Sequence, residues 1–198
     1  MTLGRLSRVL LGIAVAAAMM TPRPGDARAG DGYTVTVRLV LVRGESTART
    51  DSAVWIPPDG GEEDVSRGAQ LPAGGTLKVF FPVVTLYLDD AGGNRFVLQC
   101  PGCTEDDPLV LTVGDPGDGT PFRQSGGRVT WEIEPVREGL FRILLDVLRG
   151  PGEELVPVAV RGTLFRTEAG GGTHALTVAE GSVSYGEGTA ARLLEGGE

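Results

Sequence analysis

The chain has 198 residues, with 31 glycines, 13 prolines, an apolar fraction of 41% and a formal net charge of −8. This many glycines and prolines favour short strands joined by tight turns over long helices. A negatively charged surface repels nucleic-acid phosphates and anionic lipid headgroups, so the composition argues against nucleic-acid binding. The length favours a single domain.

Residues 1–29 have the three-part layout of a signal peptide. Two arginines precede an apolar run from Val9 to Met20, and a polar stretch then ends at Ala27-Arg28-Ala29. The run is about 12 residues long, whereas a permanent membrane helix needs roughly 20. We therefore expect cleavage after Ala29, which leaves a domain of residues 30–198 in the periplasm or outside the cell, with no stable membrane insertion. Retention of the segment as an uncleaved anchor is the alternative.

Alternating apolar and polar residues predict β-strands in the body of the chain. From Tyr33 to Leu41 every second position is apolar, and the same period of two recurs at 129–133 and 156–160. Between Leu77 and Gln99, two apolar runs flank the stretch Asp89–Asn94. The Asp, Gly and Asn residues of this stretch favour a tight reversal, so we predict a hairpin.

The segment Leu140–Leu148 fits both a helical stripe and a strand face, and we interpret it as a strand. The stretches Asp59–Asp64 and Gly114–Gly127 are rich in Gly, Asp and Pro, and the second is a candidate border between two lobes. The patterns together predict an all-β fold. We expect a single domain, an antiparallel β-sandwich or a β-roll-like structure of many short strands with little helix.

Cys100 and Cys103 stand in Cys-Pro-Gly-Cys, which has the spacing of a thioredoxin-like motif. Redox catalysis needs the first cysteine at a helix N-terminus, but Thr-Glu-Asp-Asp-Pro follows the motif instead. Zinc needs about four ligands, and the only histidine to add to the two thiols is His174. We therefore expect a disulfide between Cys100 and Cys103, formed in an oxidising compartment and without dithiol turnover.

The sequence contains no recognisable catalytic, cofactor-binding or metal-binding apparatus. Its one histidine, His174, follows a run of glycines, and there is no nucleophile elbow and no phosphate-cradling glycine loop. The acidic stretches Glu62–Asp64 and Glu105–Asp107 lack the spaced ligands of a calcium loop. We expect a protein that is not an enzyme and that uses no cofactor.

Two tryptophans are candidates for a sugar-stacking surface. Trp131 lies on the apolar side of its predicted strand, so we expect it in the core. A core position is also the more common one for Trp55, which we keep as the possible aromatic contact for a ligand.

The stretch Val158–Phe165 resembles the signature of FecR domains, in which one strand reads Val-x-Val-Arg-Gly-Thr-x-Phe. A predicted strand at Thr173–Ala179, a Glu-Gly turn, a strand at Ser182–Tyr185 and a Leu-rich tail at Leu193–Glu198 then follow in the family's order. The residues that carry the motif are Val160, Arg161, Gly162, Thr163, Phe165, Glu180 and Gly181. Their composition fits a role in building the fold, with glycines for close approach and tight turns and a phenylalanine for the core.

The resemblance is specific over residues 155–198 and looser over 52–100, and it does not extend to 104–150. The best-known FecR proteins are inner-membrane regulators whose cytoplasmic N-terminal helices hold a sigma factor. Only eight residues precede the apolar run here, too few for such helices, so we expect no sigma-factor partner.

The resemblance therefore implies a free-standing, periplasmic FecR-like domain that binds another envelope protein or senses a signal. The alternatives are a cell-wall or glycan-binding module and a structural envelope protein. We expect the binding surface on the C-terminal strands, Val156–Phe165 and Thr173–Tyr185, with Thr177 facing outward.

Overall fold

The computed structural model describes residues 32–117, 119, 121–135, 140–146, 155–170, 173–186 and 191–197. The predicted signal peptide, residues 1–29, lies outside these residues. In the part of the chain that the structure describes, no helix has the length and apolar character that crossing a bilayer requires.

The described residues form seventeen β-strands and no helix. The strands are β1 (Thr34–Val42), β2 (Glu45–Thr47), β3 (Arg49–Ile56), β4 (Glu63–Ser66), β5 (Gln70–Pro72), β6 (Thr76–Val79), β7 (Val84–Asp90), β8 (Arg95–Gln99), β9 (Leu109–Thr112), β10 (Phe122–Ser125), β11 (Gly127–Ile133), β12 (Phe141–Asp146), β13 (Leu155–Val160), β14 (Thr163–Gly170), β15 (Thr173–Glu180), β16 (Ser182–Tyr185) and β17 (Arg192–Glu195).

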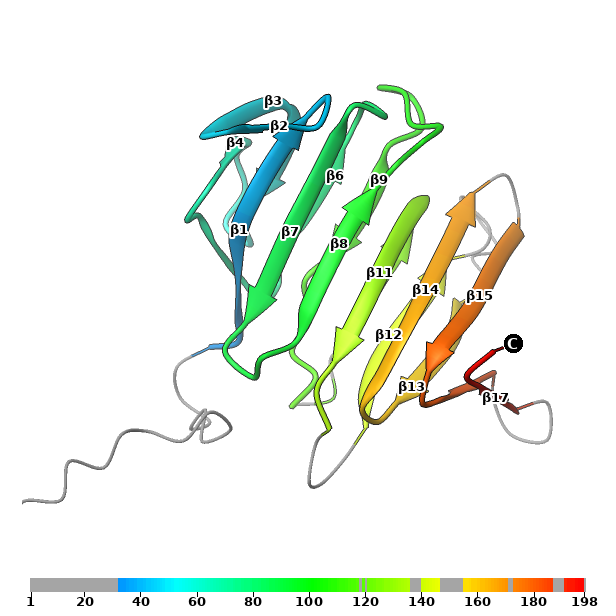
Figure 1. Cartoon of the computed structure of the whole chain (residues 1–198). Helices are drawn as coiled ribbons and strands as arrows, with labels where there is room; N and C mark the ends of the chain where they lie inside the picture. Colours follow the sequence, from blue (N-terminus) through cyan, green and yellow to red (C-terminus); the bar gives the residue numbers. More distant parts are fainter. Residues whose placement is uncertain are drawn as a thin grey trace, which may run out of the picture.

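The strands form two sheets that pack face to face as a sandwich (Figure 1). Sheet A has the order β15-β14-β11-β8-β7-β1-β2, with β5 also beside β1, and sheet B has the order β17-β16-β13-β12-β10-β9-β6-β3-β4. The described strand pairs are antiparallel except for β10 and β12, which run parallel. The chain advances along the sandwich while crossing between the sheets, so its first and last strands lie at opposite ends. The predicted all-β sandwich is confirmed.

Alternation of buried and exposed side chains explains why these segments form strands. In β11, for example, Val129, Trp131 and Ile133 are buried, whereas the residues between them are less buried or exposed. Strands β1, β11 and β13 and the β7–β8 hairpin lie where the sequence predicted strands. Strand β12 confirms the strand interpretation of residues 140–148, of which 147 and 148 lie outside the described part.

One hydrophobic core extends through the sandwich and joins side chains from both sheets. At its centre, the rings of Phe96 on sheet A and Phe122 on sheet B have centroids 5.3 Å apart, and Phe141 stacks on Phe122 at 5.4 Å. Trp131 is fully buried, as the sequence predicted, and stacks on Phe165 at 6.1 Å. Such aromatic contacts add to the stabilisation that burial of the rings already provides.

The stretch Gly114–Gly127 does not separate two lobes, contrary to the expectation from its composition. Strand β11, which follows it, pairs with β8, which precedes it, and the core is continuous across this pair. The segment contains β10 and leads from β9 to β11 within one sandwich.

Gly127 lies at the turn where the chain passes from β10 in sheet B to β11 in sheet A. Its φ is +65°, and a Cβ atom at this position would lie 2.6 Å from Leu109 Cδ1 and 2.9 Å from Cys100 Sγ. Glycine is therefore required both by the backbone conformation and by the close packing of the turn.

A polar cluster closes the β7–β8 hairpin. The Tyr33 hydroxyl donates to Asp90 Oδ2 at 2.7 Å, and the backbone N–H and side-chain amide of Asn94 donate to the same carboxylate at 2.9 and 2.6 Å. The Glu134 N–H donates to Asn94 Oδ1 at 3.0 Å, which attaches the hairpin to the end of β11. Burial, and secondarily the Asp90 carboxylate, raise the pKa of Tyr33 well above its usual value.

We predict that Gly127→Ala lowers the free energy of unfolding by about 2–4 kcal/mol, because the added methyl group forces both backbone strain and a displacement of Leu109. Gly102→Ala is the matched control, because nothing lies within 4 Å of a Cβ atom there and no positive φ is involved. Chemical denaturation of both variants provides the comparison, and equal stability of the two would contradict the packing described for the turn.

The raised pKa of Tyr33 predicts a loss of stability at alkaline pH. A tyrosine in the unfolded chain ionises near pH 10, whereas the folded protein holds Tyr33 protonated, so the free energy of unfolding should fall as the pH rises above about 10. Denaturation midpoints between pH 8 and pH 11 test this, with Tyr33→Phe as the control. The variant should lose less stability over this range, and parallel curves for the two proteins would contradict the assignment.

Candidate functional site

The motif residues build two neighbouring corners at which the chain changes sheet. The first joins β13 to β14 at Arg161 and Gly162, and the second joins β15 to β16 at Gly181. Gly162 and Gly181 have φ values of +63° and +84°. A Cβ atom on Gly181 would lie 2.7 Å from the Gly162 carbonyl oxygen and 2.9 Å from Thr163 Oγ1. The two glycines therefore allow the corners to touch.

The other motif residues hold these corners against the core. Thr163 is buried, and its hydroxyl donates to the Ser182 carbonyl at 3.0 Å across the two corners. Val160 and Phe165 are buried in the core. Arg161 and Glu180, which complete the motif, are exposed on the surface.

Cys100 and Cys103 are joined by a disulfide, with Cα atoms 5.2 Å apart. Both residues are buried, and the Leu109 N–H donates to Cys103 Sγ at 2.9 Å. The disulfide thus secures the connection between β8 and β9 beneath the Gly127 turn, where a Cβ atom would approach Cys100.

Trp55 is not an exposed aromatic platform, because only 4% of its surface is accessible. A Cβ atom on Gly75 would lie 2.1 Å from the indole ring, so the ring packs directly over this glycine backbone. This contact could not be predicted from the sequence, because Gly75 is distant from Trp55 along the chain. His174 is half-buried, and its ring meets that of Tyr185 at a centroid distance of 6.4 Å.

Strand β15 is the edge strand of sheet A at the C-terminal end of the sandwich (Figure 1). On the side away from β14, the Val178 carbonyl accepts a hydrogen bond from the Gly197 N–H at 3.0 Å. In an antiparallel pair, successive residues direct their backbone groups to opposite sides of the strand. The N–H and C=O groups of Leu176 and His174 therefore point outward as well, and β14 is the only described strand that pairs with β15.

The outward side chains of β15 are small and uncharged from Thr173 to Ala179. Those on the outer face of the sheet are Thr173, Ala175, Thr177 and Ala179, and all are exposed. Long sheet edges in natural proteins are commonly protected by charged residues, by proline or by shortness of the strand. Eight residues long, β15 has none of these protections before Glu180.

The other described sheet edges are better protected. Strands β2 and β5 are three residues long, and β5 ends at Pro72. Strand β4 contains Glu63 and Asp64, and the four-residue β17 begins with Arg192 and ends with Glu195. Among the described edges, β15 is thus the one with a long stretch, Thr173–Ala179, that has no Asp, Glu, Lys, Arg or Pro.

The inner side of the β15 edge leaves part of the core uncovered. Leu176 on β15, Tyr185 on β16 and Leu194 on β17 pack against the core but are only partly buried. These three residues come from both sheets, because β15 ends sheet A while β16 and β17 end sheet B. We call them the apolar margin of the edge.

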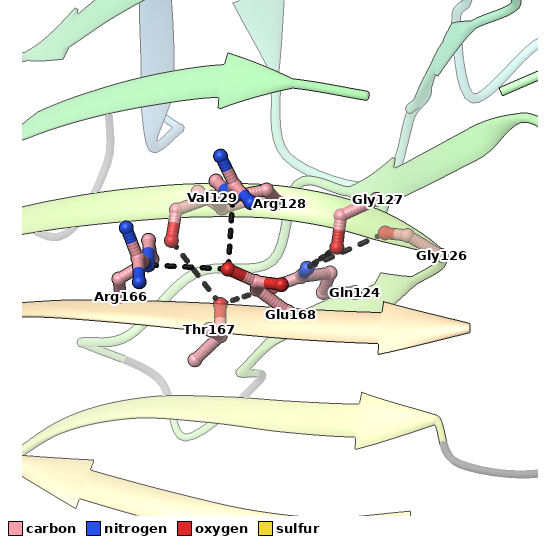
Figure 2. Close-up of polar contacts among 8 residues, drawn as sticks. All are labelled: Gln124, Gly126, Gly127, Arg128, Val129, Arg166, Thr167 and Glu168. Carbon is pink, nitrogen blue, oxygen red and sulfur yellow. Dashed lines mark hydrogen bonds and ion pairs between the residues drawn. The ribbon is translucent and has the colours of Figure 1, made fainter. Parts of the chain in front are cut away.

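Two arginines share one carboxylate on the outer face of sheet A (Figure 2). Arg166 and Glu168 lie on β14, which pairs with β15. Arg128 Nε lies 2.9 Å from Glu168 Oε1, and Arg166 Nε lies 3.3 Å from the same oxygen. The structure gives the Nη groups of these arginines no hydrogen bond to any described residue. We call these three residues the arginine cluster.

A buried chain of hydrogen bonds holds the strands beneath the arginine cluster. Trp131 Nε1 donates to Thr167 Oγ1 at 2.7 Å, and the Thr167 hydroxyl donates to Gln124 Oε1. The Gln124 amide donates to the carbonyls of Gly126 and Gly127 at 3.3 and 3.1 Å (Figure 2). Because Gln124 lies on β10 and Thr167 on β14, this chain ties the two sheets together.

A shallow hollow of about 260 Å³ opens beside the disulfide turn. The backbone at Gly126 and Gly127 and the side chains of Arg128, Glu168 and Asp107 contribute to its walls. It shares Arg128 and Glu168 with the arginine cluster, and Gly102 and Gly170 also line it. Within the described ranges, no three His, Cys, Asp or Glu side chains lie close enough to hold a metal ion.

Comparisons of the chain with models of known protein families, with curated proteins and with solved structures found no match.

We predict that Thr167→Val lowers the free energy of unfolding by about 1–3 kcal/mol, because it leaves the buried Trp131 N–H and Gln124 carbonyl without partners while preserving the side-chain shape. Thr177→Val, an equal change on the exposed face of β15, should shift stability by less than about 0.5 kcal/mol. Thermal and urea denaturation measure both variants. Equal, small effects would show that the buried chain contributes nothing to the joining of the sheets.

Proposed function

We propose that this chain is an exported, FecR-like, non-enzymatic domain that binds an extended segment of another envelope protein along the edge of β15. The observation that carries the proposal is the open edge itself. A bound segment would add a strand to sheet A and would gain main-chain hydrogen bonds from the outward groups of His174 and Leu176. The resemblance of the two corners to the FecR signature supports the assignment to such a domain.

The position of β15 at the edge reduces the expected binding surface, Val156–Phe165 and Thr173–Tyr185, to a single strand. Strand β13 lies between β12 and β16, and β14 lies between β11 and β15, so the backbone of both strands is already paired. Of the C-terminal strands considered, β15 has an open side. Pairing with β14 and the hydrogen bond from Gly197 to Val178 hold β15 in place. Binding of a partner to this preformed edge would therefore cost little conformational entropy in the domain.

The glycan-binding alternative depended on an exposed Trp55, which the structure does not show. A sugar-stacking surface needs an exposed aromatic face, and Trp55 is covered by the sandwich. Protein recognition along β15 is therefore the function that we propose.

Substitution of His174 tests the proposal, because its N–H points to the open side of β15. His174→Pro removes that donor without removing a hydrogen bond to β14, whereas His174→Val keeps the donor and favours a strand. A photo-crosslinking amino acid at the exposed position Thr177 should capture a partner in cells that export the protein. We predict that the crosslinked product falls at least about tenfold with His174→Pro and persists with His174→Val.

A photo-crosslinking residue at the exposed, distant position Glu62 serves as the control for non-specific capture. Circular dichroism of the purified variants establishes that both remain folded. A crosslinked product that survives His174→Pro, or the absence of any product specific to Thr177, would refute strand addition at this edge.

A further inference from the structure

We propose that the segment bound by β15 alternates apolar with acidic side chains, the apolar ones entering the margin between the sheets and the acidic ones binding the arginine cluster. This inference rests on the proposed function and specifies the chemistry of the partner. It follows from the two surfaces beside β15, which are the arginine cluster on the outer face of sheet A and the apolar margin on the inner face.

The register places the arginine cluster beside the open edge. Arg166 lies directly opposite Thr177, and Glu168 lies directly opposite Ala175. A strand added to β15 would continue these rows of outer-face side chains. Thr177 and Ala175 are small, so they leave the space between the arginine cluster and the added strand open.

The distance suits a contact between an arginine and a carboxylate. Neighbouring strands lie about 4.8 Å apart, so a residue opposite Thr177 on the added strand would lie about 10 Å from the Arg166 backbone. An arginine and a glutamate side chain together span this separation. The guanidinium fork favours carboxylates because it offers paired N–H donors.

The charges within the cluster favour one more carboxylate. Arg128 and Arg166 share the single negative charge of Glu168, and their Nη groups lack described partners. The nearby Arg95 is different, because Glu132 on the adjacent strand pairs with it at 3.2 Å. Glu180 is exposed at the far end of β15, so the favoured place for an acidic residue is opposite Thr177 or Ala175, away from Glu180.

The inner side of the edge requires apolar side chains. Residues of the added strand opposite His174 and Leu176 would point between the two sheets. There they would cover Leu176, Tyr185 and Leu194, which the domain leaves only partly buried. Burial of apolar surface at this margin would stabilise the complex.

A second copy of the chain suits this edge less well. The only acidic residue of β15 is Glu180 at its end, so a second copy paired antiparallel about Leu176 would place Ala175 opposite Thr177 and would bring no carboxylate to either position. The arginine cluster therefore points to a different protein as the partner.

Two short fluorescein-labelled peptides test the inference, one alternating valine with glutamate and the other alternating valine with lysine. Fluorescence anisotropy with the purified protein should show that the glutamate peptide binds about tenfold more tightly, as expected for a charge-assisted contact. Arg166→Gln should remove most of this preference. Arg95→Gln, which alters an arginine of the same sheet face that already has a partner, should leave it unchanged.

The outcomes separate the inference from the proposed function. Equal affinity for the two peptides, with binding lost in His174→Pro, would overturn the acidic pattern but leave strand addition at β15 intact. Binding of neither peptide by the folded protein, or binding that survives His174→Pro, would overturn both. A concentration-dependent dimer in light scattering that His174→Pro abolishes would assign the edge to a second copy and would also overturn the acidic-partner inference.

Discussion

A β-sheet satisfies the backbone hydrogen bonds of its interior strands but leaves one side of each edge strand unpaired. In this protein the two sheets pack face to face, and their C-terminal edge strands, β15 and β17, lie close to each other. Sheet B ends in the short, charged β17, whereas sheet A ends in the longer β15, which carries no Asp, Glu, Lys or Arg before Glu180. This difference between the two ends is the basis on which we propose that another chain binds at β15.

The rest of the structure fixes β15 in position. The corners at Gly162 and Gly181 join the β14–β15 hairpin to sheet B, and the buried chain through Thr167 joins β14 to β10. The Gly197 N–H attaches the C-terminal turn to β15 at Val178. The motif residues thus help to fix the position of β15. The proposed contacts with a partner are made by other residues, namely the outward backbone groups of His174 and Leu176.

Much of the fold could be predicted from the sequence because strands have a local signature. Apolar residues at every second position predicted β1, β11 and β13. The Asp, Gly and Asn residues at 89–94 predicted the β7–β8 hairpin. The outward position of Thr177 was also predicted, and its side chain is exposed. These features depend on residues close together in the chain.

The edge and its surroundings could not be predicted in this way, because they depend on which strands pair. Nothing local shows that β14 is the only described strand that pairs with β15, or that the backbone groups of His174 and Leu176 point away from β14 while those of Thr177 face it. The arginine cluster forms only when β11 lies beside β14. Trp55 was considered as a ligand contact because the sequence does not show that Gly75 lies under its ring.

Amide hydrogen exchange along β15, resolved by residue with NMR, tests the central claim most directly. The open edge predicts alternation, in which the amides of His174 and Leu176 exchange rapidly while those of Ala175 and Thr177 are protected by β14. Equal protection of all four amides would mean that another segment covers the edge, and equally rapid exchange of all four would mean that β15 does not pair with β14. Either result would contradict the account.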